Sequence, residues 1–216
     1  MSNPNLTEQL EAAVRQFKAD SPMEAQIQIG QMIEELQKSG VASGKQAGEK
    51  AADFRLTNAL GREVILYDEL AKGPVVLVFY RGGWCPFCNM QLRAYQQILP
   101  EIQAMGAQLI AISPQQPDHS LSLQEKEGLE FQVLSDPNGV VTAKYDLLFD
   151  VPAGVQALME GIGLDLAEYN NTSKWVLPVP ATFMIDENAV IRSSYVNPNF
   201  MQHQSPEDIL RELKKL

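Results

Sequence analysis

The sequence predicts an α/β layer fold, because apolar strand patterns alternate with helical patterns along the chain. The run PVVLVFY at 74–80 has no charged position and is typical of a strand buried on both faces. A helical pattern follows it, in which the apolar residues from Leu92 to Ile102 share one face. A second apolar run, AQLIAIS at 107–113, predicts another buried strand. At 216 residues and 45% hydrophobic content, the chain can bury one principal core.

Two amphipathic helices are expected before this domain. Apolar residues recur at helical spacing from Leu6 to Phe17, and the pattern resumes after Ser21–Pro22 and continues to Leu36. The segment SGVASGKQAGEKA at 39–51 has no periodicity and predicts a linker. We therefore expect a helical extension with its linker over 1–47 and the principal domain over 48–216.

The remaining elements of the domain are short. Strands are expected at 53–56, 62–67, 131–136, 181–186 and 189–196, the last two joined as a hairpin through Glu187–Asn188. A helix is expected near 120–128. Residues 145–176 carry weaker signals and are interpreted as an insertion with a short helix at 155–160. Ser205 can cap a final helix that begins at Pro206.

Charge and hydropathy exclude several classes of partner. The formal net charge of −10 repels phosphate backbones and anionic lipid headgroups, so neither nucleic acid nor a membrane surface is expected as a partner. No apolar run approaches the roughly 20 residues that span a bilayer. The N-terminus also lacks the pattern of a secretory signal, so a cytoplasmic location is the default expectation.

The only two cysteines stand in RGGWCPFCNM, residues 81–90. A buried strand, a Gly-Gly turn and a proline suited to the first helical turn place Cys85 at a helix N-terminus. Unpaired N–H groups and the helix dipole there favour the thiolate of Cys85. Cys88 lies one turn further on, so a disulfide between the two can form with little backbone movement. The spacing therefore predicts a reversible dithiol.

Two other interpretations of this pair stay open. A structural zinc site usually needs four ligands, and only His119 and His203 remain to complete one, both far away in sequence. Alternatively, the cysteines are inert buried thiols. Neither histidine lies in a motif, so both are expected at the surface, and no metal or cofactor is expected.

Five segments carry a resemblance to a known family: GEKAADFRL, VVLVFYRGGWCPFCNMQLRAY, LIAIS, FQVLSD and PVPATFMIDENAVI. From about Gly48 to Asn197 the chain resembles the peroxiredoxin-like branch of the thioredoxin-fold proteins, the alkyl hydroperoxide reductase and thiol-specific antioxidant relatives. The resemblance implies a thioredoxin-like fold with a central mixed sheet flanked by helices, here with an N-terminal helical extension. It also implies a thiol-dependent oxidoreductase with an antioxidant role.

At the cysteines the resemblance divides between two groups. Counting from the shared Phe-Tyr, the peroxide-attacking cysteine of peroxiredoxins falls on Cys88, but their proline and threonine fall on Arg81 and Cys85, and their distant arginine falls on Pro180. WCPFC and VPATF instead resemble the W-C-x-x-C site and the Val/Ile-Pro-Thr stretch of thioredoxins and glutaredoxins.

Four further residues are candidate site residues, and two of them, Val179 and Pro180, follow from the resemblance to thioredoxins and glutaredoxins. A cis Val179–Pro180 bond would face the cysteines and offer a backbone edge to substrate. Trp84 is expected as an aromatic rim or as part of the core. Arg81 would supply a positive charge or lie exposed at the surface.

Two activities therefore remain open. In disulfide reduction, Cys85 attacks and Cys88 resolves the mixed disulfide; in peroxide reduction, Cys88 attacks and its sulfenic acid condenses with Cys85. Both cycles need a reductant of the thioredoxin or glutathione type, and a homodimer is compatible with them. A non-enzymatic alternative is a redox-sensing or partner-binding module whose N-terminal helices dock on another subunit, although packing of those helices on the domain's own surface is the favoured interpretation.

Overall fold

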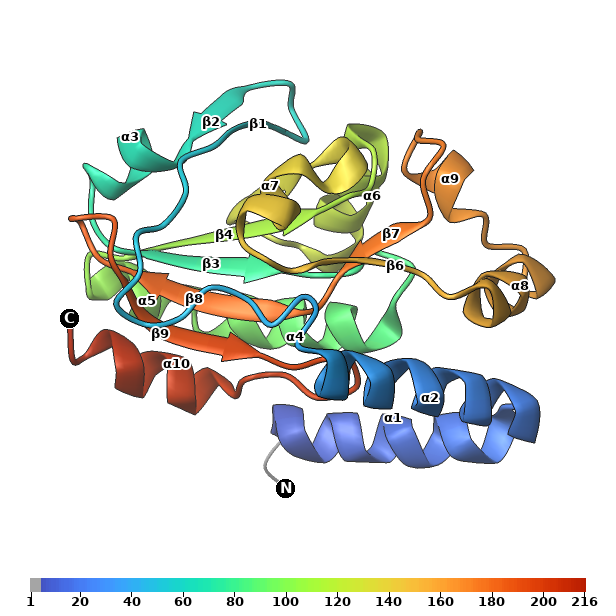
Figure 1. The fold of residues 1–216 in the computed structure, drawn as a ribbon. Helices are drawn as coiled ribbons and strands as arrows, with labels where there is room; N and C mark the ends of the chain where they lie inside the picture. Colours follow the sequence, from blue (N-terminus) through green and yellow to red (C-terminus); the bar gives the residue numbers. More distant parts are fainter. Residues whose placement is uncertain (1–4) are drawn as a thin grey trace.

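The computed structural model describes residues 5–216, which form a mixed seven-stranded sheet with helices on both faces (Figure 1). The strands lie in the order β2-β1-β5-β4-β3-β8-β9, with β3, β4 and β5 parallel and the others antiparallel to their neighbours. Their bounds are β1 Arg55–Asn58, β2 Glu63–Ile65, β3 Val75–Phe79, β4 Gln108–Ser113, β5 Gln132–Ser135, β8 Ala181–Ile185 and β9 Ile191–Val196. A mixed central sheet was expected and is confirmed.

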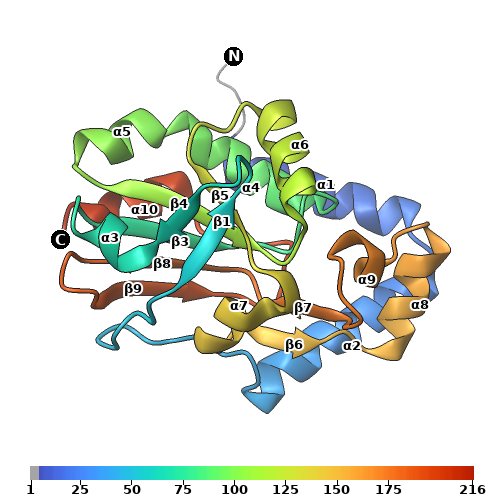
Figure 2. The same ribbon diagram turned by 90° about the horizontal axis from the view of Figure 1, so that it is seen from above.

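Helices and a separate two-stranded sheet complete the layers (Figures 1 and 2). One face of the large sheet carries α4 (Pro86–Gln97), α5 (Leu99–Ala104), α6 (Pro117–Glu127) and α10 (Pro206–Leu213). The other carries α7 (Val140–Lys144) and the pair β6 (Leu148–Asp150) and β7 (Val176–Pro178). The remaining elements are α3 (Leu66–Leu70), the 3₁₀ turn Pro137–Gly139, α8 (Ala153–Gly161) and α9 (Leu166–Tyr169).

The core is built around β3, which is buried at every position. Val75 pairs with Gln108 of β4 on one side and with Ile185 of β8 on the other, so the strand is covered at both edges as well as both faces. A central strand of this kind must be apolar throughout, which explains the uninterrupted run in the sequence. The strand ends at Phe79, which places the cysteine-bearing segment at one end of the sheet.

The two N-terminal helices are confirmed as α1 (Leu6–Asp20) and α2 (Met23–Ser39), separated by Ser21–Pro22. They form a hairpin at the end of the sheet where β3 ends, away from the C-terminus (Figure 1). Leu6 and Leu10 of α1 and Met32 and Ile33 of α2 are buried in the common core. α1 packs against α4, and α2 lies beside α8. The extension therefore packs on its own domain.

Several boundaries differ from the sequence prediction. The helix expected through Ile102 is broken at Ile98, because Pro100 cannot supply a helical N–H and instead opens the new helix α5. The strand expected at 62–67 ends at Ile65, and the residues after it form α3. The segment 145–176 contains not only the expected helix, which is α8, but also β6 and α9.

The C-terminal predictions are confirmed. β8 and β9 form the expected hairpin, and the side chain of Ser205 accepts the N–H of Asp208 to cap α10 at 3.1 Å. Of the helices described, none is long and apolar enough to cross a lipid bilayer.

Candidate active site

The candidate site begins where β3 ends, at a tight segment from Tyr80 to Trp84 that leads into α4. Gly82 has φ +147°, and a Cβ there would lie 2.5 Å from Nε1 of Trp84. Only glycine fits this position without displacing the indole. Cys85 is the N-cap residue of α4 and Pro86 follows in its first turn, so the predicted helix-terminal position of Cys85 is confirmed.

Two polar side chains that sequence reasoning missed hold this segment in place. The N–H of Gly83 donates to Oε1 of Gln115 at 2.7 Å, and Nδ2 of Asn89 donates to the carbonyl of Gly83 at 2.8 Å. Gln115 is fully buried and also donates from Nε2 to the hydroxyl of Tyr80 at 3.1 Å. Gln115 follows β4, and β4 runs parallel to β3, so both strands end at the same edge. A parallel pairing of these two strands, inferred from the sequence, could have indicated that Gln115 lies near the cysteines.

The Cys85 side chain is only 1% exposed, but its surroundings favour the thiolate form. Burial opposes the charge, but a hydrogen bond from the Cys88 side chain, the positive charge of Arg81 and the N–H groups of Cys88 and Phe87 outweigh it. Together they lower the pKa of Cys85 below its ordinary value. The two N–H groups are free because they belong to the first turn of α4. Cys85 is therefore the thiolate of the pair.

Cys88 is fully buried, and its pKa is raised. Burial is the largest cause, and the hydrogen bond to Cys85 and its negative charge act in the same direction, against the backbone N–H and charge of Arg81. The two thiols therefore share one negative charge, which resides on Cys85.

Arg81 is buried, with 5% exposure, and the alternative of an exposed surface arginine is wrong. Its guanidinium lies 3.8 Å from the ring centroid of Phe200 and 4.8 Å from that of Trp84. Cation–π interactions with these two rings therefore stabilise the positive charge. Its Nε finds no hydrogen-bond acceptor within the described part of the chain. Trp84 is itself half-buried and packs against the core. The cation thus lies beside the thiols.

The expectation for His203 was wrong, because this side chain is buried rather than at the surface. Burial, and secondarily the nearby charge of Arg81, lower the pKa of His203 to about 3. His119 is half-buried, and its ring stacks on Tyr169 at 3.8 Å. Among residues 5–216, no group of three His, Cys, Asp or Glu side chains is close enough to hold a metal ion.

The expected cis bond at Val179–Pro180 is also wrong, because the bond is trans. The N–H of Val179 donates to the carbonyl of Leu147 at 2.8 Å, and the carbonyl of Pro180 accepts the N–H of Asn197 at 3.1 Å. Neighbouring segments thus occupy these backbone groups and hold the stretch extended. Since Ala181 pairs with Phe79, Pro180 still lies at the sheet end that carries the cysteines. A role for Val179 and Pro180 in substrate binding stays a prediction.

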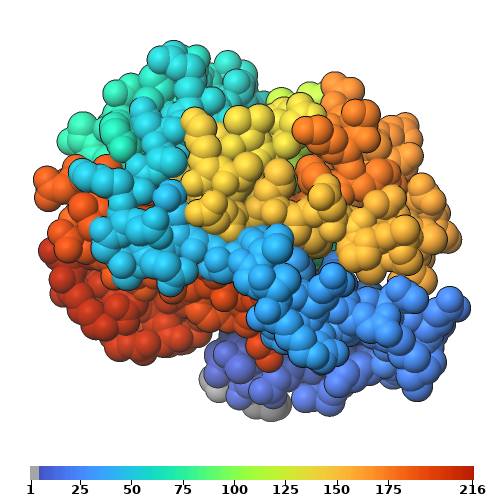
Figure 3. All heavy atoms as spheres, in the orientation of Figure 1, coloured from blue at the N-terminus to red at the C-terminus, as the bar shows by residue number. Residues whose placement is uncertain are grey.

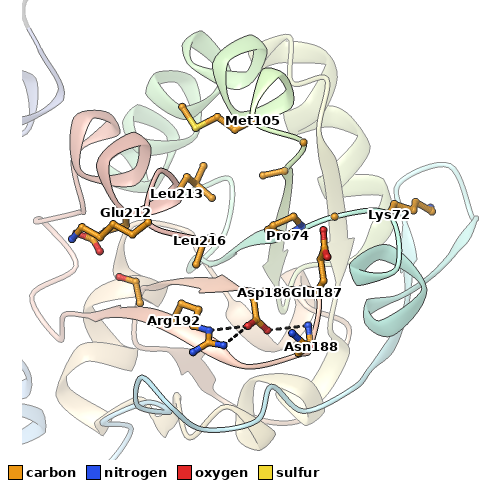
Figure 4. Close-up of a pocket in the computed structure, with 15 residues that line it drawn as sticks. Lys72, Pro74, Met105, Asp186, Glu187, Asn188, Arg192, Glu212, Leu213 and Leu216 are labelled. Carbon is orange, nitrogen blue, oxygen red and sulfur yellow. Dashed lines mark hydrogen bonds and ion pairs between the residues drawn. The ribbon is translucent and has the colours of Figure 1, made fainter.

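A cavity of about 460 Å³ opens beside Cys85 and is lined mainly by apolar side chains. Arg81, Trp84 and Phe87 line it with Cys85, whereas Cys88 does not. A larger cavity of about 700 Å³ lies near the C-terminus, among the turn from β8 to β9, β9 itself and α10 (Figure 4). It holds no cysteine, and its Arg192 is paired with Asp186 at 2.7 Å. The smaller cavity is therefore the candidate active site.

Comparisons with known proteins show the family of the chain and its fold. The model of the AhpC/TSA family matches residues 47–194. A Mycobacterium tuberculosis protein named "Putative peroxiredoxin Rv2521" is 26% identical over 156 residues, which cover 72% of this chain and 88% of that protein. The thiol-disulfide oxidoreductase ResA of Geobacillus thermodenitrificans is 25% identical over 170 residues, 78% of this chain and 77% of ResA.

Solved structures show the same fold. The crystal structure of peroxidoxin BcpB from Mycobacterium tuberculosis superposes with a TM-score of 0.62 at 20% identity, covering 79% of this chain and 97% of that one. A peroxiredoxin-like protein from Aquifex aeolicus gives a TM-score of 0.61 at 16% identity, over 80% of this chain and 89% of that one.

Proposed function

Because the chain belongs to the AhpC/TSA family, we propose that it is a thiol-dependent oxidoreductase that cycles Cys85 and Cys88 between a dithiol and a disulfide. The observation that carries the proposal is the difference between the two thiols. Cys85 has the lowered pKa and lines the cavity, whereas Cys88 has the raised pKa and is enclosed by the core. We therefore assign the first attack to Cys85.

Disulfide reduction fits this assignment directly. The Cys85 thiolate attacks one sulfur of the substrate disulfide, forming a mixed disulfide and releasing the other half as a thiolate. Cys88 then loses its proton and attacks the sulfur of Cys85, which releases the second half and closes the Cys85–Cys88 bond. The substrate gains two electrons and the enzyme loses two. Trp84 lines the cavity in which the substrate would lie.

The charge arrangement explains how a buried Cys88 can become reactive at the second step. In the dithiol state, the negative charge of Cys85 contributes to the raised pKa of Cys88. The mixed disulfide removes that charge, while the positive charge of Arg81 stays. The pKa of Cys88 should then fall. The attack of the first thiol therefore activates the second.

Hydroperoxide reduction is a second candidate, which the relatives named as peroxiredoxins favour. The sequence expectation gave the peroxide attack to Cys88, but the lowered pKa of Cys85 and the raised pKa of Cys88 favour the opposite roles. The Cys85 thiolate attacks the O–O bond, becomes a sulfenic acid and releases an alcohol or water after proton uptake. Cys88 condenses with the sulfenic acid to give the same disulfide and one water. The buried charge of Arg81 beside the sulfur would stabilise the leaving oxygen.

Both cycles end in a disulfide that an external donor must reduce. Peroxiredoxin-family proteins use reductants of the thioredoxin type, and we propose a thioredoxin- or glutathione-type donor for this chain. A homodimer and a cytoplasmic location remain predictions from the sequence.

Trapping experiments with single-cysteine variants test the order of attack. In Cys88→Ser, a substrate disulfide should leave a mixed disulfide on Cys85 that cannot be resolved, and hydrogen peroxide should leave a sulfenic acid there. In Cys85→Ser, both reactions should be slower than in the wild type by at least about a hundredfold, because the remaining thiol is protonated and enclosed. Intact-mass and peptide-mass measurements after rapid acid quench detect the adducts.

The opposite pattern, with Cys85→Ser reacting as fast as the wild type and Cys88→Ser inert, would assign the attack to Cys88. Comparing the second-order rate constants for hydrogen peroxide and for insulin disulfides separates the two activities. If neither reagent oxidises the wild type, a non-enzymatic partner-binding module is the better account.

A further inference from the structure

The cavity beside Cys85 is built largely by parts of the chain outside the sheet. Phe17 of α1 and Ala25 and Ile29 of α2 form one wall, and Val155 and Leu158 of α8 form another. Figure 3 shows α2, in blue, beside the segment that carries α8, in gold and orange. Helices α1 and α2 precede residue 47, where the match to the family begins. Part of the cavity wall therefore comes from a segment outside the part of the chain that matches the family.

The walls of the cavity are mainly apolar. Arg81 is the only lysine, arginine or carboxylate side chain among the described residues that line the cavity. Its charge already lies beside the Cys85 thiolate and lowers the pKa of that thiol. The cavity therefore offers no second cation for an anionic substrate, and the chain as a whole carries a formal charge of −10. An anionic disulfide would be repelled at long range and left without a partner in the site. A cationic disulfide would meet the positive charge of Arg81 and find no carboxylate among the described residues that line the cavity.

The size of the cavity points to a small molecule. Its volume of about 460 Å³ lies within the range of about 300–1,000 Å³ that is typical of pockets for small organic ligands. Burial of an apolar substituent here would remove both the ligand and the exposed parts of Phe17 and Ile29 from water.

We infer that the substrate of Cys85 is a neutral, low-molecular-weight disulfide with an apolar substituent, which α1, α2 and α8 bind in this cavity. The inference rests on the proposed disulfide chemistry of Cys85. It assigns the N-terminal helices a part in substrate selection. After the attack, the apolar half remains in the cavity, joined to Cys85 as the mixed disulfide, and the other half leaves as a thiolate.

A homologous series of substrates tests this inference. The reduced wild-type protein is mixed with diethyl, dipropyl and dibutyl disulfide, and each second-order rate constant is divided by that of free 2-mercaptoethanol with the same disulfide. Each step of the series adds one methylene to each half, and only one half is buried in the cavity. Each step should therefore raise the ratio about three- to fourfold, since burial of one methylene favours binding by that factor. Glutathione disulfide should give a lower ratio than any of the three.

Matched variants locate the effect in the cavity. Ile29→Asp places a carboxylate in the wall, and the gain per methylene should fall below about twofold. Ile27→Asp is the control on the same helix, because Ile27 is 50% exposed and does not line the cavity, and it should keep the wild-type gain. Ala25→Phe narrows the cavity without burying a charge. It should slow dibutyl disulfide more than diethyl disulfide, and this variant decides the matter if Ile29→Asp does not fold.

The experiment separates a wrong substrate class from a wrong assignment of the disulfide chemistry. If Cys85 reacts with all three disulfides at ratios independent of chain length, or if Ile27→Asp and Ile29→Asp behave alike, the inferred substrate class is wrong and the disulfide chemistry stands. If none of the disulfides reacts while ethyl and butyl hydroperoxide do, the disulfide chemistry itself is overturned, and the inference with it.

Discussion

Acidification should destabilise this protein through one buried histidine. The pKa of His203 is lowered from 6.5 to about 3, chiefly by burial. In the unfolded chain His203 takes up a proton near pH 6.5, whereas the folded protein holds it neutral down to about pH 3. The folded state therefore binds fewer protons, and its stability falls as the pH falls through this window.

The expected loss follows from these two values. At pH 5 nearly every unfolded molecule carries the proton on His203 and nearly every folded one does not. The free energy of unfolding is therefore about 2 kcal/mol lower at pH 5 than at pH 7. The result depends little on the folded value, provided that it stays below about 4. His203→Gln keeps a polar side chain but has no proton to gain. It should therefore lose about 2 kcal/mol less than the wild type between pH 7 and pH 5.

Urea unfolding at both pH values, under reducing conditions, measures this double difference. Any change in packing caused by the substitution cancels, because it acts at both pH values. His119→Gln, at the only other histidine, is the matched control and should keep the wild-type loss. Equal losses in the wild type and in His203→Gln would refute the reasoning, because they would mean that His203 is protonated in the folded protein or that its environment is open to water.

Three further changes test the site itself. Arg81→Met should raise the pKa of Cys85 by removing a nearby positive charge, and the pH profile of iodoacetamide alkylation of Cys85 should shift upward accordingly; an unchanged profile would count against the electrostatic account. Gly82→Ala should destabilise the fold by at least about 1 kcal/mol in urea unfolding, because of its positive φ and the nearby indole, whereas Gly83→Ala, with ordinary contacts at 3.5 Å, should cost less. Gln115→Leu should lower the free energy of unfolding by about 1–3 kcal/mol, because it removes the acceptor of the half-buried Gly83 N–H and a donor to the buried hydroxyl of Tyr80; a smaller loss would show that water replaces the amide.

Local patterns in the sequence were enough to predict the frame of the site. An apolar strand, two glycines and a proline place Cys85 at the start of α4, and each of these signals acts within a few residues. The N-terminal helices were predicted for the same reason, since the apolar spacing along each helix is itself the signal.

Features that depend on tertiary contacts could not be predicted in this way. His203 lies in a loop without periodicity, and a cavity that it lines is shared with Leu10 and Val14 of α1, almost the whole chain away. Arg81 is buried because Phe200 and Trp84 cover it, and nothing near Arg81 in sequence indicates the first of these contacts. The trans bond before Pro180 is the ordinary state of an X-Pro bond, and only the resemblance to thioredoxins suggested the cis form.

The central claim is that Cys85 attacks first and Cys88 closes the internal disulfide, and time-resolved mass spectrometry of the wild-type protein tests it most directly. Reduced protein is mixed with dibutyl disulfide, quenched in acid at successive times, digested and mapped. We predict a butylthio adduct on Cys85 that appears first and then decays as the peptide containing both cysteines loses two hydrogens. A first adduct on Cys88, or an adduct on Cys85 that never converts to the internal disulfide, would contradict the account.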